Sequence, residues 1–204
     1  DQLLDIIQMD MTPSDNRRSK ANMASMNPSL FWGNVNAGFG YQYMQNMLSL
    51  NNGLLVNDSL PDFSNISRMA GVSSTDWSWG SLFADLDNDG WKDIFISNGT
   101  RREINNKDYF DALKKKKPSK DSLLSRTLAI PSEKIDNVVF KNKGDLTFEK
   151  VNEKWGLSFF GFSNGSVYAD LDNDGDLEIV TNNIDDFATI FENRSSEINN
   201  HLTL

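Results

Sequence analysis

The sequence contains no cysteine and only one histidine, His201, among its 204 residues. The absence of cysteine excludes a disulfide framework and any metal site built from thiolates. Because the one histidine lies at the end of the chain, Ser-His-Asp and Cys-His catalytic arrangements and histidine-ligated zinc all lack their parts. We therefore predict that the chain is not an enzyme.

The sequence also lacks a long apolar run and an excess of basic residues. No run is long enough to span a membrane, and no signal peptide is recognisable. Acidic residues outnumber basic residues by 29 to 20, which gives a formal net charge of −9. Phosphate binding requires a basic face, so nucleic acid is not expected as a partner. The composition is otherwise that of an ordinary globular protein.

An acidic loop occurs twice in the chain. Residues 85–93 read Asp-Leu-Asp-Asn-Asp-Gly-Trp-Lys-Asp, and residues 170–178 read Asp-Leu-Asp-Asn-Asp-Gly-Asp-Leu-Glu. Apolar runs flank both copies, so each is predicted to be a loop between two short strands. Carboxylates at positions 1, 3, 5 and 9 can converge on one centre, because the glycine at position 6 permits a sharp turn. Hard oxygen ligands in this number suit Ca²⁺.

The predicted calcium ligands include one main-chain carbonyl oxygen in each loop, at position 7. The first set is Asp85, Asp87, Asp89, Asp93 and the carbonyl of Trp91; the second is Asp170, Asp172, Asp174, Glu178 and the carbonyl of Asp176. Without a cation, carboxylates about 4 Å apart would repel one another by about 1 kcal/mol per pair in water. Two bound Ca²⁺ ions would reduce the net charge from −9 to −5.

Two other interpretations share this sequence pattern. An EF-hand requires a glutamate at position 12 and flanking helices, whereas position 12 is Ile96 or Thr181 and the flanks are strand-like. Asp, Asn and Gly also form ordinary polar turns, and that alternative stays open. The acid at position 9 in both copies argues against it.

The repeated loop divides the chain into units. Residues 1–18 are predicted to be the tail of a preceding repeat, because Asp1 to Ile7 align with Asp89 to Phe95, and we expect the sequence to be part of a longer protein. Repeats with a calcium loop are predicted at 19–100 and 137–186, with a helical insertion at 101–136 and a further unit beginning at 187–204. Repeats of this length indicate a propeller or an array. Gln2 replaces the loop glycine, so calcium at Asp1 and Asp5 is left open.

Three local predictions concern segments outside the acidic loops. A helix is predicted to start at Ser14 or Asp15. The aromatic segment Phe31 to Tyr43 is expected to pack between sheets, with a sugar-stacking platform as the alternative. A turn is predicted at Asn51 to Gly53, and a strand at Phe63 to Met69.

Several segments together resemble a known family. They are Asp10 to Arg18, Trp77 to Gly80, Phe83 to Gly99, Asn142 to Phe148 and Tyr168 to Asn183. These segments resemble FG-GAP/VCBS repeats and, more closely, bacterial ASPIC/UnbV-type proteins, which are relatives of cartilage acidic protein. The resemblance implies an all-β fold made of β-propeller blades, as part of a propeller that commonly has seven, with calcium in the inter-strand loops. Residues 187–204 would then begin the next repeat or an ASPIC/UnbV domain.

The resemblance also implies a location and a type of partner. It implies an extracytoplasmic protein, secreted, periplasmic or at the cell surface, that presents a surface for adhesion to a protein or glycan ligand. Two alternatives stay open: the propeller portion of a polysaccharide-degrading enzyme that uses paired carboxylates, and a nucleic-acid-associated protein. The sequence does not predict the oligomeric state.

Overall fold

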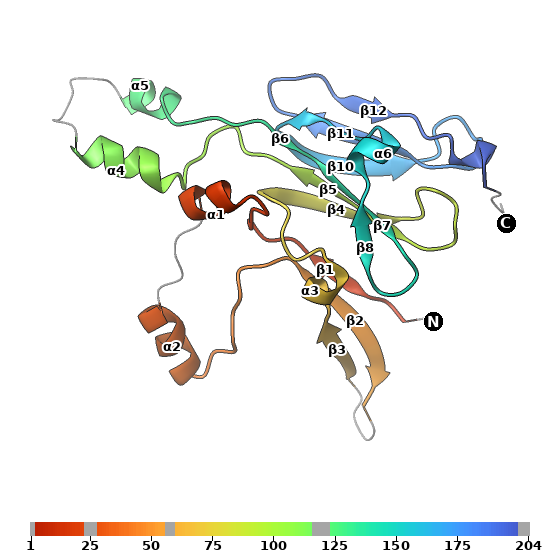
Figure 1. Cartoon of the computed structure of the whole chain (residues 1–204), viewed down its shortest axis with the longest axis horizontal. Helices are drawn as coiled ribbons and strands as arrows, with labels where there is room; N and C mark the ends of the chain where they lie inside the picture. The colour runs from red at the N-terminus through yellow and green to blue at the C-terminus, as the bar shows by residue number, and fades with distance from the viewer. Residues whose placement is uncertain (1–2, 23–27, 56–59, 116–122, 200–204) are drawn as a thin grey trace.

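The structure is a computed structural model that describes residues 3–22, 28–55, 60–115 and 123–199 (Figure 1). Strands account for 34% of the residues and helices for 23%, which confirms a mainly β protein. The strands are β1 (Ile6–Gln8), β2 (Met47–Leu54), β3 (Pro61–Asn65), β4 (Ser78–Ala84), β5 (Asp93–Asn98), β6 (Ile135–Asp136), β7 (Val138–Asn142), β8 (Phe148–Lys150), β9 (Phe160–Gly161), β10 (Ser163–Ala169), β11 (Glu178–Asn183) and β12 (Thr189–Phe191).

The helices are short and lie between the strands in the sequence. They are α1 (Asn16–Asn22), α2 (Pro28–Asn36), α3 (Ser67–Ala70), α4 (Lys107–Lys115), α5 (Leu123–Leu128), α6 (Asn152–Trp155) and the 3₁₀ helix η1 (Ser195–Glu197). Helices α4 and α5 fall within residues 101–136, where the sequence predicts helices. Figure 1 shows α1, α2, α4 and α5 at one end of the molecule and the larger sheets at the other. No helix in the described ranges combines the length and apolar character that crossing a membrane requires.

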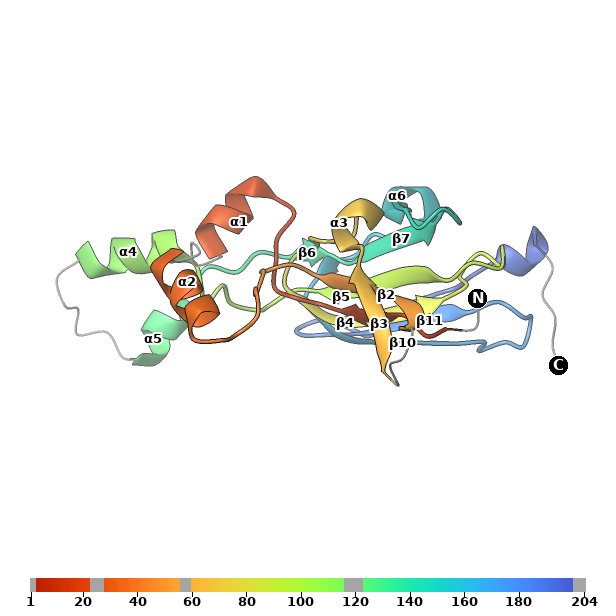
Figure 2. The same cartoon turned by 90° about the horizontal axis from the view of Figure 1, so that it is seen from below.

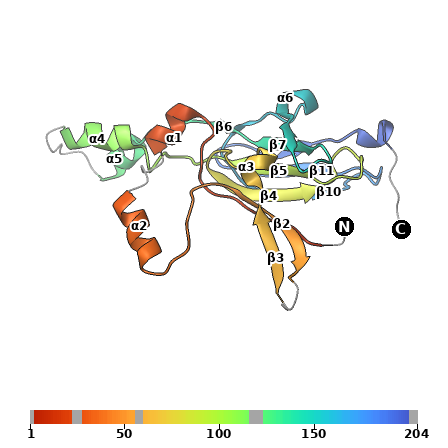
Figure 3. The same cartoon turned by 60° about the horizontal axis from the view of Figure 1, so that its bottom comes forward.

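The strands form three larger antiparallel sheets, each with its strands in sequence order, although β6 lies between β5 and β7 in the chain and belongs to another sheet. Their orders are β1-β2-β3, β4-β5-β7-β8 and β10-β11-β12, and β6 pairs with β9 in a small fourth sheet. Figure 2 shows α3 and α6 on the same side of these sheets, and Figure 3 shows the β2–β3 hairpin extending away from the other strands. Residues 3–199, where described, form neither a closed barrel nor a closed propeller.

Two hydrophobic cores lie on opposite faces of the central sheet, β4-β5-β7-β8. Successive side chains of a strand point to opposite faces. Ile94 and Ile96 of β5 therefore pack in the core that includes Leu48 of β2, whereas Phe95 packs in the core that includes Ile179 of β11. All residues of β5 are buried. The central sheet is thus covered by the first sheet on one face and by the third sheet on the other.

A buried charge cluster joins α1 to the start of β4. The helix begins after Asp15, whose side chain accepts a hydrogen bond from the main-chain N–H of Arg18 at 2.8 Å, which confirms the predicted helix start. The Arg18 side chain is 6% exposed and pairs with Asp76 at 2.8 Å and with Glu103 at 2.5 Å. Because the cluster draws residues from three separate segments, it fixes the helical end of the molecule to the sheets.

The structure corrects three local predictions. The aromatic segment is wrong as inter-sheet core, because Trp32, Tyr41 and Tyr43 are each more than half exposed. The predicted turn at residues 51–53 is instead a register irregularity, through which β2 continues to Leu54. The strand predicted over residues 63–69 ends at Asn65, whose side-chain oxygen accepts hydrogen bonds from the N–H and hydroxyl of Ser67, the first residue of α3.

Candidate metal centres

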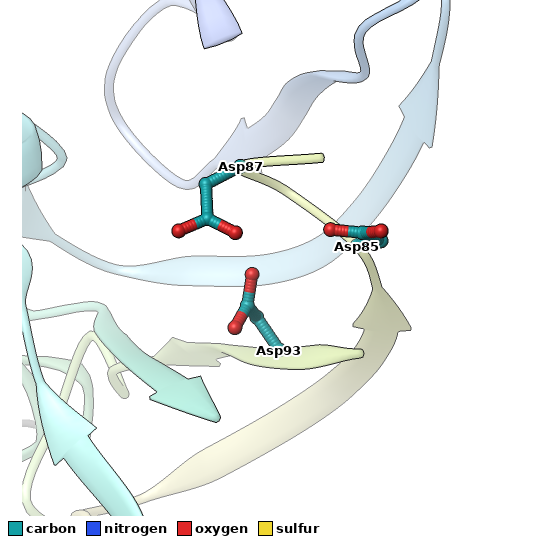
Figure 4. Close-up of side chains that lie close together, drawn as sticks. All are labelled: Asp85, Asp87 and Asp93. Carbon is teal, nitrogen blue, oxygen red and sulfur yellow. The ribbon is translucent and has the colours of Figure 1, made fainter. Parts of the chain in front are cut away.

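The first acidic loop connects β4 to β5. Ala84 and Asp93 are paired as the last and first residues of these antiparallel strands, so the loop folds back on itself between them. The structure brings Asp85, Asp87 and Asp93 together, with one carboxylate oxygen from each lying within 4.8 Å of the others. Figure 4 shows these side chains directed toward one another. Oxygens about 2.4 Å from a shared Ca²⁺ would be separated by no more than roughly 5 Å, so this spacing fits calcium.

Hydrogen bonds within the first loop hold its acids in place. The Asp85 carboxylate accepts the main-chain N–H groups of Asp89 at 3.1 Å and Gly90 at 2.9 Å. The Asp93 carboxylate accepts the N–H of Leu86 at 3.0 Å, and Asp89 accepts the N–H of Trp91 at 2.9 Å. The main chain thus turns around the acidic side chains, which the left-handed conformation of Gly90 at φ 90° permits.

The second acidic loop, between β10 and β11, repeats three of these internal hydrogen bonds. Gly175 N–H donates to Asp170 at 3.2 Å, and Asp176 N–H donates to Asp174 at 3.1 Å. Leu171 N–H donates to Glu178 at 2.7 Å. The left-handed residues also correspond, since Asn88 and Asn173 have φ angles of 55° and 59°. The repetition predicted from the sequence is therefore also a repetition of loop conformation.

An asparagine closes each loop at its ninth residue, from the last position of β7 in the first loop and from just beyond the end of β12 in the second. Asn142 N–H donates to Asp93 at 2.8 Å, and its side-chain amide donates to the carbonyl of Lys92 at 3.0 Å. Asn193 makes the corresponding bonds, at 3.4 Å to Glu178 and at 3.2 Å to the carbonyl of Leu177. In both loops the ninth acid is therefore held by its own loop and by an asparagine at or just beyond the end of the next strand.

The same closure is present in the predicted N-terminal repeat. Asn51 N–H donates to Asp5 at 2.9 Å, and the Asn51 side chain donates to the carbonyl of Leu4 at 3.2 Å. The strand registers agree, since Ile6 pairs with Ser49 as Ile94 pairs with Phe140. Asp5 therefore has the structural position of Asp93. Asp1 and Gln2 lie outside the described residues.

The second loop contains two overlapping acid clusters. One is Asp170, Asp172 and Glu178; the other is Asp174, Asp176 and Glu178, again with oxygens within 4.8 Å. The Asp176 side chain, of which the sequence predicts only the carbonyl as a ligand, is fully buried. One of its oxygens accepts the N–H of Ser196 at 3.0 Å, and the other has no partner among the described residues. The second loop thus gathers five carboxylates.

Burial and like charge affect the ionisation of these acids. Burial raises the pKa of Asp93 to about 7, against the hydrogen bonds from Asn142 and Leu86. The pKa of Asp172 is raised by partial desolvation and by the charge of Asp174. A hydrogen bond from Asp176 N–H lowers the pKa of Asp174. A divalent cation would favour the charged form of all three.

The donor atoms of both loops fit a hard cation such as Ca²⁺. They are carboxylate oxygens, which calcium prefers. In the first loop Asp87 Oδ1 is buried without a hydrogen-bond partner among the described residues, as is Asp176 Oδ1 in the second. An unsatisfied buried oxygen of a carboxylate is costly. A cation in each loop would satisfy these oxygens.

One predicted calcium ligand of the first loop, Asp89, forms an ion pair with a lysine and does not join the other acids. Asp89 is absent from the first acid cluster, and its carboxylate pairs with the ammonium of Lys141 on β7 at 2.7 Å. Lys141 also forms an ion pair with Asp87. Desolvation opposes ionisation of Asp89, but the hydrogen bond from Lys141 lowers its pKa. In the sequence, aligning the two repeats matches Lys141 with Glu192. This difference in charge is the sequence signal that sets the lysine apart.

Comparisons with known proteins add no family assignment. No model of a protein family matches the chain, and a search of curated proteins finds no match. The resemblance to FG-GAP/VCBS and ASPIC/UnbV-type proteins therefore stays a prediction.

Proposed function

We propose that the chain is a non-catalytic, calcium-binding part of a β-propeller of the FG-GAP/VCBS type, in an extracytoplasmic protein related to the ASPIC/UnbV group. The observation that carries the proposal is the pair of acidic loops with matching hydrogen bonds and converging carboxylates. Ca²⁺ in each loop would link the strands on either side through their shared ligands. The metal would serve to stabilise the fold, not to activate a substrate.

The arrangement of the sheets supports the propeller part of the proposal. Propeller blades are antiparallel sheets of successive strands that pack face to face. The central sheet has four strands in sequence order, and its two faces contact the cores shared with the first and third sheets. This face-to-face packing of three antiparallel sheets supports the proposal that they are adjacent blades.

A calcium titration tests the metal part of the proposal. Extracellular calcium modules have dissociation constants of about 10⁻⁴ to 10⁻³ M, so millimolar Ca²⁺ would stabilise the fold by about 1 kcal/mol per site. We would titrate the chain with CaCl₂ by calorimetry and repeat the titration with MgCl₂. We expect two Ca²⁺ sites, one lost in Asp87→Ala and the other in Glu178→Gln, which removes the acid that both clusters of the second loop share. Asp108→Ala, which removes an exposed acid from α4, should retain both.

The calcium proposal would be abandoned if the folded wild-type chain bound no Ca²⁺. It would also fail if Asp108→Ala reduced calcium binding as much as the loop variants do. Circular dichroism of each variant without metal would establish that the comparison is between folded proteins.

The exposed aromatic cluster supports a protein or glycan as the surface ligand. Phe31 lies with its ring centroid 5.4 Å from that of Trp32, 6.3 Å from Tyr41 and 6.1 Å from Tyr43. Exposed aromatic rings with polar edges are common at binding surfaces. Binding of the chain to a glycan array and to immobilised extracellular-matrix proteins should decrease in Trp32→Ala. Phe187→Ala, which removes a 90% exposed ring elsewhere, is the control.

A further inference from the structure

The two acidic loops share a hydrogen-bonding frame, but the residues that stand at the same position beside the two loops have opposite charges. Ile94 pairs with Phe140, and Ile179 pairs with Phe191. Asn142 and Asn193 then close the two loops in the same way. The residue between the phenylalanine and the asparagine is Lys141 in the first repeat and Glu192 in the second. These two residues are therefore structurally equivalent.

Lys141 places its ammonium among the acids of the first loop. It forms ion pairs with Asp87 and Asp89, the latter at 2.7 Å, and its side chain is 26% exposed. Its ammonium also lies 5.7 Å from the ring centroid of Trp155, a favourable position for a cation. The ammonium therefore interacts with two carboxylates that the sequence predicts as calcium ligands.

Glu192 supplies no such cation to the second loop. Its carboxylate pairs with Arg194 at 3.1 Å, and both side chains are about two-thirds exposed. At position 5 of the loop, Asp174 takes part in an acid cluster, whereas the equivalent Asp89 turns to Lys141. The second loop also has an acidic side chain at position 7, Asp176, where the first has Trp91.

We propose that Lys141 is a built-in counter-ion that lowers the calcium affinity of the first loop, so that the two loops fill in sequence. The second loop binds Ca²⁺ at the lower concentration. The first loop binds Ca²⁺ only when the metal displaces the ammonium from Asp87 and Asp89, because both cations require the same oxygens. The inference rests on the proposed calcium function and adds to it an order of filling and the residue that sets it.

The effect of Lys141 is measured with one loop active at a time. Glu178→Gln removes the acid that both clusters of the second loop share, so calorimetry with CaCl₂ then reports the first loop. In this background we would compare Lys141→Met with Lys92→Met. Methionine retains the unbranched apolar length of lysine, and both changes remove one positive charge close to the first loop. Lys92 forms no ion pair with any described residue.

We expect Lys141→Met to tighten Ca²⁺ binding to the first loop roughly tenfold, which corresponds to about 1.4 kcal/mol. Lys92→Met should change the affinity by less than about twofold, because an exposed, unpaired charge is screened by solvent. Equal effects of the two substitutions would mean that Lys141 acts only through its charge near the loop, as Lys92 does, and would overturn the inference. No change in Lys141→Met would also overturn it.

The reciprocal substitution is made in the second loop. In the Asp87→Ala background, Glu192→Lys should weaken Ca²⁺ binding to the second loop, whereas Glu192→Gln removes the negative charge without supplying an ammonium. A larger loss in Glu192→Lys than in Glu192→Gln supports direct competition, and equal losses contradict it.

The wild-type titration distinguishes failure of the role proposed for Lys141 from failure of the proposed calcium-binding function. Two Ca²⁺ sites of equal affinity would overturn the role of Lys141 while leaving the proposed function intact. The absence of calcium binding in every folded variant would overturn both. Two sites of unequal affinity, with the weaker one lost in Asp87→Ala, support both.

Discussion

The side-chain amide of Asn88, in the first acidic loop, donates a hydrogen bond to the carbonyl oxygen of Gly175, in the second loop, at 3.3 Å. A second link is made by Asn193, whose amide donates to Leu86 at 2.7 Å and to Leu177 at 3.2 Å. The two loops therefore contact each other directly. A cation that ordered one loop would therefore also order the hydrogen-bonding partners of the other.

We predict that calcium binding to the two loops is coupled through these hydrogen bonds. Asn88→Gly removes the inter-loop amide but preserves the left-handed backbone, which glycine adopts freely. It should weaken the coupling between the sites by a few-fold, which calorimetry resolves as a change in the ratio of the two stepwise affinities. Asn173→Gly changes the equivalent left-handed residue of the second loop and is the matched control. Equal effects of both substitutions would indicate a change in backbone flexibility, not in coupling.

The buried Arg18 cluster yields a prediction about stability. Its partners Asp76 and Glu103 are about 5% exposed, so removal of the guanidinium leaves two carboxylates buried without their cation. Arg18→Met should therefore lower the free energy of unfolding by about 3 to 5 kcal/mol. Arg17→Met is the control, because Arg17 pairs with Glu133 at the surface, where solvent screens the pair, and should lose far less stability. Urea denaturation measures both, and similar losses would contradict a buried network.

The acidic loops could be predicted because their chemistry depends on local spacing. Asp85, Asp87 and Asp93 converge through a turn encoded within nine residues, and the flanking apolar runs form the paired strands β4 and β5. The continuous apolar run of Ile94, Phe95 and Ile96 also agrees with a strand buried on both faces. The repetition strengthens the prediction, because the same spacing of acids occurs independently in both loops.

The features that could not be predicted depend on contacts between distant segments. Lys141 reaches Asp87 and Asp89 because β7 pairs with β5, a relationship that the loop sequence alone does not contain. The exposure of Trp32 likewise depends on which sheets lie beside α2, and hydrophobic composition alone favours burial. The side-chain role of Asp176 depends on its contact with Ser196, 20 residues later.

A prediction about packing concerns Gly99, which follows β5 in a left-handed conformation at φ 125°. A Cβ at this position would lie 2.7 Å from Phe162 Cα and 2.8 Å from the carbonyl oxygen of Gly161. A left-handed alanine costs about 1 to 2 kcal/mol. Because these close contacts add to that cost, Gly99→Ala should destabilise the fold by more than this amount. Gly71→Ala is the comparison, because its φ is 81° but its nearest neighbour would be 3.7 Å away. Urea unfolding should rank Gly99→Ala as clearly the less stable variant.

The last prediction concerns the pH dependence of stability in calcium-free protein. Burial raises the pKa of Asp93 from 3.8 to about 7, so the folded chain retains a proton that the unfolded chain has lost. Stability then decreases as pH rises, because the native state binds more protons than the unfolded state. The contribution is fully present below about pH 4 and is lost as pH rises through 7.

Calcium should reverse this trend, because the metal binds the ionised form of Asp93. Thermal unfolding between pH 4 and 8, with EDTA or with millimolar CaCl₂, measures the difference. We expect stability to fall with pH in EDTA and to hold or rise with pH in CaCl₂. Asp93→Asn, which cannot ionise, should show a smaller slope in EDTA. A slope in that variant as steep as in the wild type would assign the pH dependence to other groups, since Asp93 would then contribute nothing to it.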